Sequence, residues 1–265
     1  MCKIVVAKIE NEAGRREAYK IITAQYSELI KEKDGIGIYI QEGDKKPQVD
    51  RSLKEYKDTF LSLLAHLPNS GVVAVHTRTG TSGAKDETNV HFWDCGGRIF
   101  AHNGFAEKGG VGFKSDTELY HDMEFCRGCG TAKGGICRKH KKPYHSTLYN
   151  AGYFTQREGK CDSLQFLEAM PKAITKATLE EYITENYFQG LGFLYADGKH
   201  YFLIEKTTHL WNTKDFTMLF SYTPDRTYIT QNYKTIAGIR CATDTKEQEF
   251  RYKTYTPVWG VYELK

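Results

Sequence analysis

The second residue of the chain, Cys2, combines the two groups that a self-contained nucleophile needs. Removal of Met1 would leave Cys2 with a thiol and a free α-amine on the same carbon. The amine titrates near ~7.7–8.0 and the thiol near ~8.5, so both change protonation state close to neutral pH. A neutral amine can take the thiol proton directly or through a water, which predicts a nucleophile with its own base. A cysteine beside a strand can also be an inert buried thiol, and both interpretations stay open here.

Downstream segments carry the groups that an α-amino acid substrate would need. Arg78 follows a predicted strand, where a guanidinium can bind a carboxylate through two hydrogen bonds. Asp116, at a predicted helix start, can hold an ammonium group. The side-chain amide of Asn103 and the backbone N–H of Gly104 can point at one oxygen and form an oxyanion hole. Taken singly, the same residues fit a surface ion pair, a hairpin turn and a helix start. Taken together, they predict a site where a thiolate attacks the side-chain carbonyl of an amino acid.

Hydrophobic spacing predicts the elements that would hold these residues. Strands are expected at residues 3–7, 35–40, 72–76, 98–102, 192–196, 201–205, 218–221, 228–230 and 258–264. Helices are expected at residues 15–33, 52–67, 115–125, 163–175 and 179–186. Asn103-Gly104 is expected to form a tight turn after a strand, and turns such as Asp197-Gly198 indicate antiparallel pairing. The pattern predicts an α+β fold with helices packed on antiparallel sheets.

Composition excludes some classes of protein and leaves others. The chain has 265 residues, of which 40% are hydrophobic and 26% charged, as in globular proteins. No apolar run approaches the ~18 residues of a membrane helix, and no signal peptide is visible at the N-terminus. A net charge of +4 is too small to imply nucleic-acid binding by itself. Seven cysteines, an odd number, favour free thiols and a reducing compartment, so a cytoplasmic location is expected.

Residues 126–159 are rich in Gly, Lys and Cys, and we interpret them as an insertion within a single domain spanning residues 1–265. The spacing of three cysteines and a histidine predicts a structural zinc site. Its ligands would be Cys126, Cys129, Cys137 and either His140 or His145. A basic loop with incidental cysteines is the alternative. The lysines and arginines of the insertion could contact nucleic acid or an acidic partner, or could simply be solvated.

In order and spacing, these motifs resemble the class II glutamine amidotransferase domain, a family of the N-terminal nucleophile hydrolases. The resemblance covers residues 2–125 well and the later strands loosely. The matching segments are Cys2, Asp34-Gly35-Ile36-Gly37, His76-Thr77-Arg78-Thr79-Gly80-Thr81-Ser82-Gly83, Asn89-Val90-His91, His102-Asn103-Gly104 and Ser115-Asp116-Thr117-Glu118. The chain departs from the family pattern at Thr79-Gly80 and at Thr81-Ser82, so the resemblance identifies the nucleophile and leaves the substrate open.

The resemblance implies a four-layer α/β/β/α sandwich of antiparallel sheets and a role for each matched residue. Cys2 would attack the glutamine side-chain amide with its own amine as base, and Asn103 and Gly104 would stabilise the oxyanion. Arg78 would bind the α-carboxylate and Asp116 the α-ammonium. Thr81 and His91 are further substrate-binding candidates. No cofactor is expected for the catalysis.

We expect a stand-alone glutaminase that passes ammonia to a separate enzyme, because no synthase, synthetase or isomerase domain is visible. No phosphate-binding GxxxxGK[ST] loop occurs in the chain, so the ammonia acceptor is expected to be an ATP-using synthetase. One alternative is a hydrolase of γ-glutamyl amides or peptides, which shares the nucleophile and the arginine loop. Another is a catalytically silent module that binds through its zinc knuckle.

Overall fold

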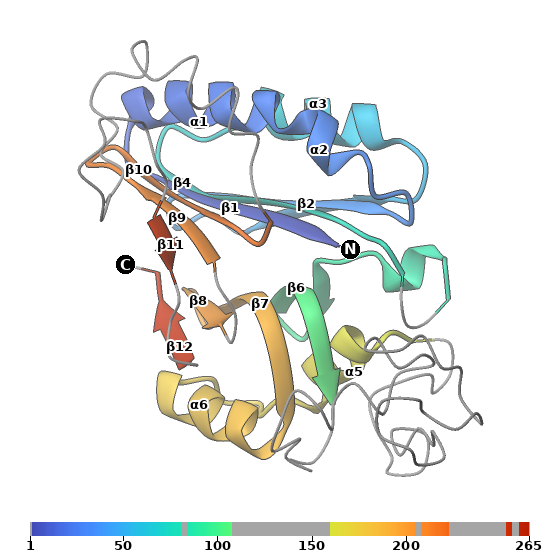
Figure 1. Ribbon diagram of the computed structural model, residues 1–265. Coiled ribbons are helices and arrows are strands. Elements are labelled where there is room, and N and C mark those ends of the chain that lie inside the picture. The colour runs from blue at the N-terminus through green and yellow to red at the C-terminus, as the bar shows by residue number, and fades with distance from the viewer. Residues whose placement is uncertain are drawn as a thin grey trace, which may run out of the picture.

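The computed structural model describes residues 2–80, 84–107, 160–204, 208–222, 253–255 and 260–264. Side chains are described throughout these ranges except at 105, 107, 187, 208–210 and 253–255. Two antiparallel sheets lie face to face, and helices cover the outer face of each (Figure 1). The expected four-layer α/β/β/α sandwich is therefore confirmed.

The larger sheet has seven strands in the order β11-β9-β10-β1-β4-β2-β3. Their bounds are Lys3–Ile9 (β1), Ile36–Glu42 (β2), Gln48–Ser52 (β3), Gly71–Thr77 (β4), Thr208–Asn212 (β9), Phe216–Phe220 (β10) and Lys253–Tyr255 (β11). Strand β1 lies between β10 and β4, so the N-terminal strand is central and paired on both edges. The residue that precedes it, Cys2, is therefore held next to two paired strands.

The smaller sheet has five strands in the order β12-β8-β7-β6-β5. Their bounds are Trp93–Cys95 (β5), Arg98–Glu107 (β6), Tyr187–Ala196 (β7), Lys199–Ile204 (β8) and Gly260–Glu263 (β12). The β7–β8 hairpin turns at Asp197-Gly198, where both residues have positive φ (51° and 75°), as the sequence predicted. Such a turn matches the twist of the paired strands.

Helices α1 (Glu12–Ala24), α2 (Tyr26–Leu29) and α3 (Tyr56–Ala65) cover the larger sheet, and α5 (Asp162–Ala169) and α6 (Lys176–Glu185) cover the smaller one (Figure 1). A 3-10 turn, η1, spans Glu87–Asn89. Among the described residues, no helix is both long and apolar enough to cross a membrane.

Three layers of buried side chains follow from strand alternation. In β1, Val5, Ala7 and Ile9 face the helices, whereas Ile4 and Val6 face the smaller sheet. A strand with apolar residues on both faces fits only the middle of a sandwich. The third layer lies between the smaller sheet and helices α5 and α6.

Several predicted elements have different bounds in the structure. The helix expected at 15–33 begins at Glu12, capped by the side chain of Asn11, and is interrupted at Gln25. The helix expected at 163–175 ends at Ala169, because Met170 precedes Pro171 and adopts the extended conformation that a proline favours. Strand β3 was missed because its residues are polar, as an edge strand allows. Strands β9 and β11 were missed as well.

The turn expected at Asn103-Gly104 is wrong. Strand β6 continues through both residues to Glu107, and Asn103 and Gly104 pair with Leu191 and Gly190 of β7. The predicted helix at 115–125, the strand at 228–230 and the insertion at 126–159 lie outside the described residues.

Candidate functional site

Cys2 directly precedes β1 and lies beside the loop that follows β4. Its Sγ is 3.4 Å from both the carbonyl oxygen and the backbone nitrogen of Thr79. The register of the two strands, with Lys3 opposite Thr77, brings this loop to the nucleophile candidate. The side chain is only half-buried, so the thiol lies at an edge of the fold.

The surroundings keep the Cys2 thiol protonated at neutral pH while Met1 is attached. Burial raises the pKa of the Cys2 thiol to about 11, although the Thr79 backbone and the charge of Arg78 act in the opposite direction. A thiol of this kind reacts only when a base removes its proton. That the α-amine of a processed Cys2 supplies this base stays a prediction.

Arg78 lies in a loop that is braced against the residues before β2. Its backbone N–H donates to the Gly35 oxygen at 2.8 Å, and its own carbonyl oxygen accepts from Asp34 N at 2.9 Å. The Asp34 carboxylate also accepts from Gly80 N at 2.7 Å and pairs with Lys85 Nζ at 2.9 Å. These contacts hold the chain on both sides of Arg78, which is itself buried (2% exposed).

Asn103 and Gly104 occupy the middle of the β6–β7 ladder. A Cβ at Gly104 would lie 1.7 Å from the Gln189 oxygen and 2.6 Å from His102 Nε2. Only glycine fits at this position, because any side chain would collide with the neighbouring strand. The glycine is not required by a turn. The side-chain amide of Asn103 points into the layer between the sheets and contacts Ser221, which is hydrogen-bonded to the backbone of Ile4. The structure thus brings Asn103 and the Cys2 strand together.

A stack of buried histidines lies next to these residues. The rings of His76 and His91 are parallel, with centroids 3.6 Å apart, and the His91 Nδ1 accepts from the backbone N–H of His102 at 3.1 Å. Burial lowers the pKa of all three histidines, with the charge of Arg78 acting in the same direction at His76 and His91. The stack is therefore uncharged at neutral pH.

The His102 ring is held in one tautomer. Its Nε2 lies 2.9 Å from the Gln189 carbonyl oxygen, which can only accept, so Nε2 carries the proton. The neutral Nδ1 then accepts from the Ser163 hydroxyl at 2.9 Å. Strand alternation directs His102 toward α5 and Asn103 toward the other sheet. His102 therefore joins the oxyanion candidate to helix α5.

The start of α5 is tied to the same region by two more contacts. Asn89 Oδ1 accepts from Cys161 N at 2.6 Å, and Asp162 Oδ2 accepts from Ala106 N at 2.9 Å. The sequence analysis did not identify Asp162, Ser163 or Ser221 as residues of the site, and it missed the bracing role of Asp34. Their partners are far away in sequence, so no local pattern identifies them.

Cys2, Arg78, Asn103, Gly104 and His91 thus belong to one region of the fold. His91 is buried and contacts His76, Trp93 and the His102 backbone, and its contact with a substrate stays a prediction. Thr81 and Asp116 lie outside the described residues, as do the predicted zinc ligands Cys126, Cys129, Cys137 and His140 and the alternative His145. Within the part of the chain that the structure describes, no cluster of three histidine, cysteine or acidic side chains could hold a metal.

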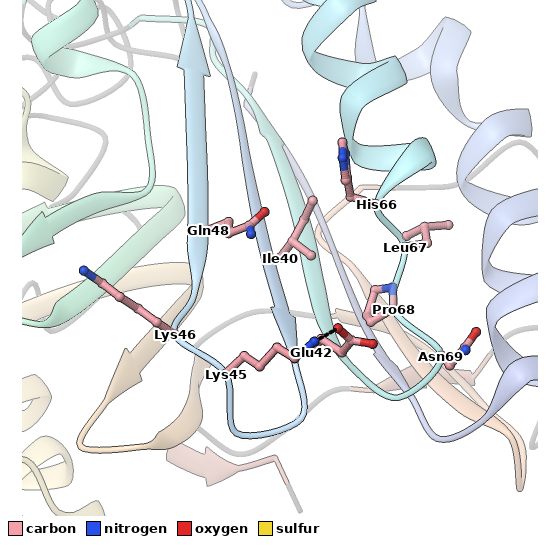
Figure 2. A pocket seen from close by; sticks show the side chains of 9 residues that line it. All are labelled: Ile40, Glu42, Lys45, Lys46, Gln48, His66, Leu67, Pro68 and Asn69. Carbon is pink, nitrogen blue, oxygen red and sulfur yellow. Dashed lines mark hydrogen bonds and ion pairs between the residues drawn. The ribbon is translucent and has the colours of Figure 1, made fainter.

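A hollow of about 290 Å³ lies at the other end of the larger sheet. It is lined by Ile40, Glu42, Lys45, Lys46, Gln48, His66, Leu67, Pro68 and Asn69, and an ion pair joins Lys45 to Glu42 at 2.6 Å (Figure 2). Ile36 of β2 pairs with Thr77 near the arginine loop, whereas Glu42 pairs with Gly71. The six-residue separation along β2 places the hollow roughly 20 Å from the Cys2 region, so it is not the predicted substrate site.

Comparisons with known proteins agree with the fold. No protein-family model matches the sequence, and no curated protein matches it significantly. A glutamine phosphoribosylpyrophosphate amidotransferase from B. subtilis, complexed with ADP and GMP, is similar in structure with a TM-score of 0.50 at 10% identity. That match covers 100% of this chain and 49% of the other. An allosteric regulatory enzyme of purine biosynthesis matches with a TM-score of 0.50 at 12% identity, over 99% of this chain and 48% of the other.

A glutamine aminotransferase class-II domain protein from Silicibacter pomeroyi matches with a TM-score of 0.40 at 16% identity, over 85% of this chain and 91% of that chain. The first two likenesses show the fold. The chain shares the four-layer fold of these two solved structures, which is the fold that its resemblance to the class II glutamine amidotransferase domain implied. It spans about half the length of the first two solved structures.

Proposed function

We propose that the protein is a glutaminase of the glutamine amidotransferase type, which hydrolyses the side-chain amide of glutamine through a thioester on Cys2. The observation that carries the proposal is the convergence of Asn103 with strand β1, which Cys2 directly precedes, from different sheets. Ile4, two residues after Cys2, and Asn103 are bonded to the same hydroxyl, that of Ser221. The strand that follows the nucleophile candidate and the side chain of the oxyanion candidate are thus linked through one hydroxyl.

The chemistry proceeds in two halves. The Cys2 thiol gives its proton to its own α-amine, and the sulfur forms a bond to the side-chain carbonyl carbon of glutamine. Negative charge moves to the carbonyl oxygen, where Asn103 Nδ2 and Gly104 N–H stabilise it. The carbon–nitrogen bond then breaks, ammonia leaves with the proton from the α-ammonium group, and a thioester remains. Water, deprotonated by the same amine, hydrolyses the thioester to glutamate and restores the thiol.

Substrate binding rests on charge complementarity. The buried Arg78 guanidinium is the candidate for the α-carboxylate, and Asp116 is the candidate for the α-ammonium. Thr81 and His91 are assigned to the same pocket. Ammonia would pass to a separate acceptor enzyme, for which an ATP-using synthetase is the proposed class, and the basic insertion is the candidate contact surface.

The direct test combines intact mass with kinetics. The purified full chain, with Met1 removal verified by mass, is treated with the glutamine-like electrophile diazo-oxo-norleucine and assayed for release of ammonia from glutamine. We expect one adduct per chain, no adduct or turnover in Cys2→Ala, and full labelling in Cys95→Ala, whose half-buried thiol lies outside the site. Asn103→Ala should lower turnover by about 10²–10³. Substantial turnover by Cys2→Ala would falsify the mechanism.

The γ-glutamyl hydrolase alternative differs in the leaving group that the pocket admits. A kcat/KM for γ-glutamyl amides or peptides well above that for glutamine would favour it. If neither substrate is turned over and Cys2 is not labelled, the silent zinc-knuckle module becomes the better interpretation.

A further inference from the structure

Ser221 stands where the two sheets meet beside the candidate site. It follows β10 directly, and its backbone N–H donates to the Ile4 oxygen at 3.0 Å. Its Oγ accepts from Ile4 N at 2.9 Å and from Asn103 Nδ2 at 2.7 Å. One hydroxyl therefore contacts both the strand that carries Cys2 and the side chain proposed for the oxyanion.

The Ser221 hydroxyl is fully used by these contacts. A hydroxyl has two lone pairs and one hydrogen. Both lone pairs accept from Ile4 and Asn103, and the hydrogen is directed toward the Ile4 oxygen at 3.4 Å. Because every bonding position has a partner, the hydroxyl cannot rotate without losing one of them.

These contacts also determine the orientation of the Asn103 amide. The Ser221 carbonyl oxygen, which can only accept, lies 3.4 Å from Asn103 Nδ2. The nitrogen must therefore face Ser221, with the amide oxygen turned away. The bond to Oγ at 2.7 Å is short, whereas the bond to the carbonyl oxygen at 3.4 Å is long and weak. A substrate oxygen can therefore replace the carbonyl oxygen as the acceptor of the second N–H.

We propose that Ser221 is a positioning residue for amide hydrolysis, which holds Asn103 Nδ2 at a fixed place relative to Cys2 by bonding to both strands. The proposal rests on the proposed function. Nothing in the local sequence marks Ser221, because 118 residues separate it from Asn103. Its role follows from the pairing of β10 with β1 and from the approach of β6 on the other side.

The kinetic test uses Ser221→Ala, Ser221→Thr and the double variant Ser221→Ala/Asn103→Ala in the full chain. Ser221→Ala removes the hydroxyl that holds Asn103 but keeps Asn103 itself as a donor. We expect its kcat to fall by about tenfold, which is less than the loss on removing an oxyanion donor, and its KM to change by less than about twofold. Ser221→Thr keeps the hydroxyl and should restore most of the kcat. In the Asn103→Ala background, Ser221→Ala should have no further effect.

Thr213→Val is the matched control. Thr213 Oγ1 accepts from Phe216 N at 3.1 Å at the opposite end of β10. The change removes a hydroxyl from the same hairpin region without touching Asn103, so kcat should not change. A kcat of Ser221→Ala within twofold of the parent would overturn the proposal. The same would follow if Ser221→Ala lowered kcat by an equal factor in the parent and in the Asn103→Ala background.

A second measurement separates this proposal from the proposed function. The two side-chain N–H signals of Asn103, identified by their loss in Asn103→Ala, are followed by ¹⁵N NMR. In the parent, one proton should be shifted and protected from exchange, and both features should disappear in Ser221→Ala. Unchanged signals would refute the tether. A parent that shows the tether but does not hydrolyse glutamine would refute the proposed function alone.

Discussion

The α-carbon of Gly80 lies directly against the guanidinium of Arg78. A Cβ at residue 80 would be 2.9 Å from both terminal nitrogens of Arg78 and 3.0 Å from its central carbon. The guanidinium therefore packs against the position where a side chain of residue 80 would begin, and glycine leaves that position open. The sequence departs from the family pattern at this residue, and the structure supplies a reason for the glycine.

Gly80→Ala should act on substrate binding and leave the fold intact. The atoms displaced are the far end of a flexible side chain, so the guanidinium can move at little cost in stability. We expect the KM for glutamine to rise about tenfold or more, as in Arg78→Lys, with little change in kcat. Gly43→Ala is the control: its Cβ would meet no atom within 4 Å, but its φ is +50°. Gly43→Ala should lower the melting temperature slightly and leave the KM unchanged. If Gly80→Ala also leaves the KM unchanged, Arg78 is not part of the binding site.

Reactivity of Cys2 should depend on removal of Met1. With Met1 in place, burial raises the pKa of the Cys2 thiol to about 11, so the thiol stays protonated until the pH approaches that value. A variant with one alanine inserted between Met1 and Cys2 should be labelled by diazo-oxo-norleucine only at high pH and should not hydrolyse glutamine. The processed protein should be labelled from about pH 8, where its α-amine is neutral. Equal labelling rates of the two forms at pH 8 would exclude the amine as base.

The buried histidines should make the protein lose stability in mild acid. Burial lowers the pKa of His76, His91 and His102, while the unfolded chain titrates near ~6.5. A depressed histidine pKa contributes stability that is present above the unfolded pKa and is lost as the pH falls below it. Each proton taken up on unfolding adds a slope of about 1.4 kcal/mol per pH unit.

Denaturant unfolding between pH 7 and pH 5 measures how the free energy of unfolding changes with pH. This interval lies above the pH range in which Asp and Glu side chains titrate. His200, whose pKa burial lowers to about 4, contributes in the same direction. His76→Phe keeps a ring against His91 but cannot titrate, so its stability should depend less on pH. His66→Gln, at an exposed position, should match the parent. A slope that His76→Phe does not reduce would contradict the assignment of a neutral His76.

The zinc prediction for the insertion needs a test that does not depend on activity. Elemental analysis of the purified chain should find about one zinc per chain, and Cys129→Ser should reduce it. Cys95→Ser, a cysteine of β5 outside the predicted ligand set, is the control and should keep the metal. Protein that is free of zinc and shows the same protease resistance in residues 126–159 would count against the site.

The local pattern of the chain was sufficient to predict helices packed on antiparallel sheets, whereas the four-layer order came from the family resemblance. Runs such as Lys3–Ile9 are apolar on both faces, and a strand of that kind must be central in a sandwich. The amphipathic helices α1 and α3 and the hairpin at Asp197-Gly198 were likewise identified from spacing and turn residues. The bounds of helices and strands were predicted less well where tertiary contacts change the local structure. The first helix, for example, is interrupted at Gln25.

The candidate nucleophile, the arginine and the Asn103-Gly104 pair could be identified from the sequence, because each carries its chemistry in its own side chain or motif. The way in which these residues are held depends on the tertiary structure. Asn103-Gly104 forms part of a strand and not a turn, because β7 offers the small residue Gly190 opposite Gly104. Ser221 takes its role from pairing between residues more than 100 positions apart. Hydrogen bonds of that range depend on strand order and register, which the whole set of packed layers determines and no local pattern encodes.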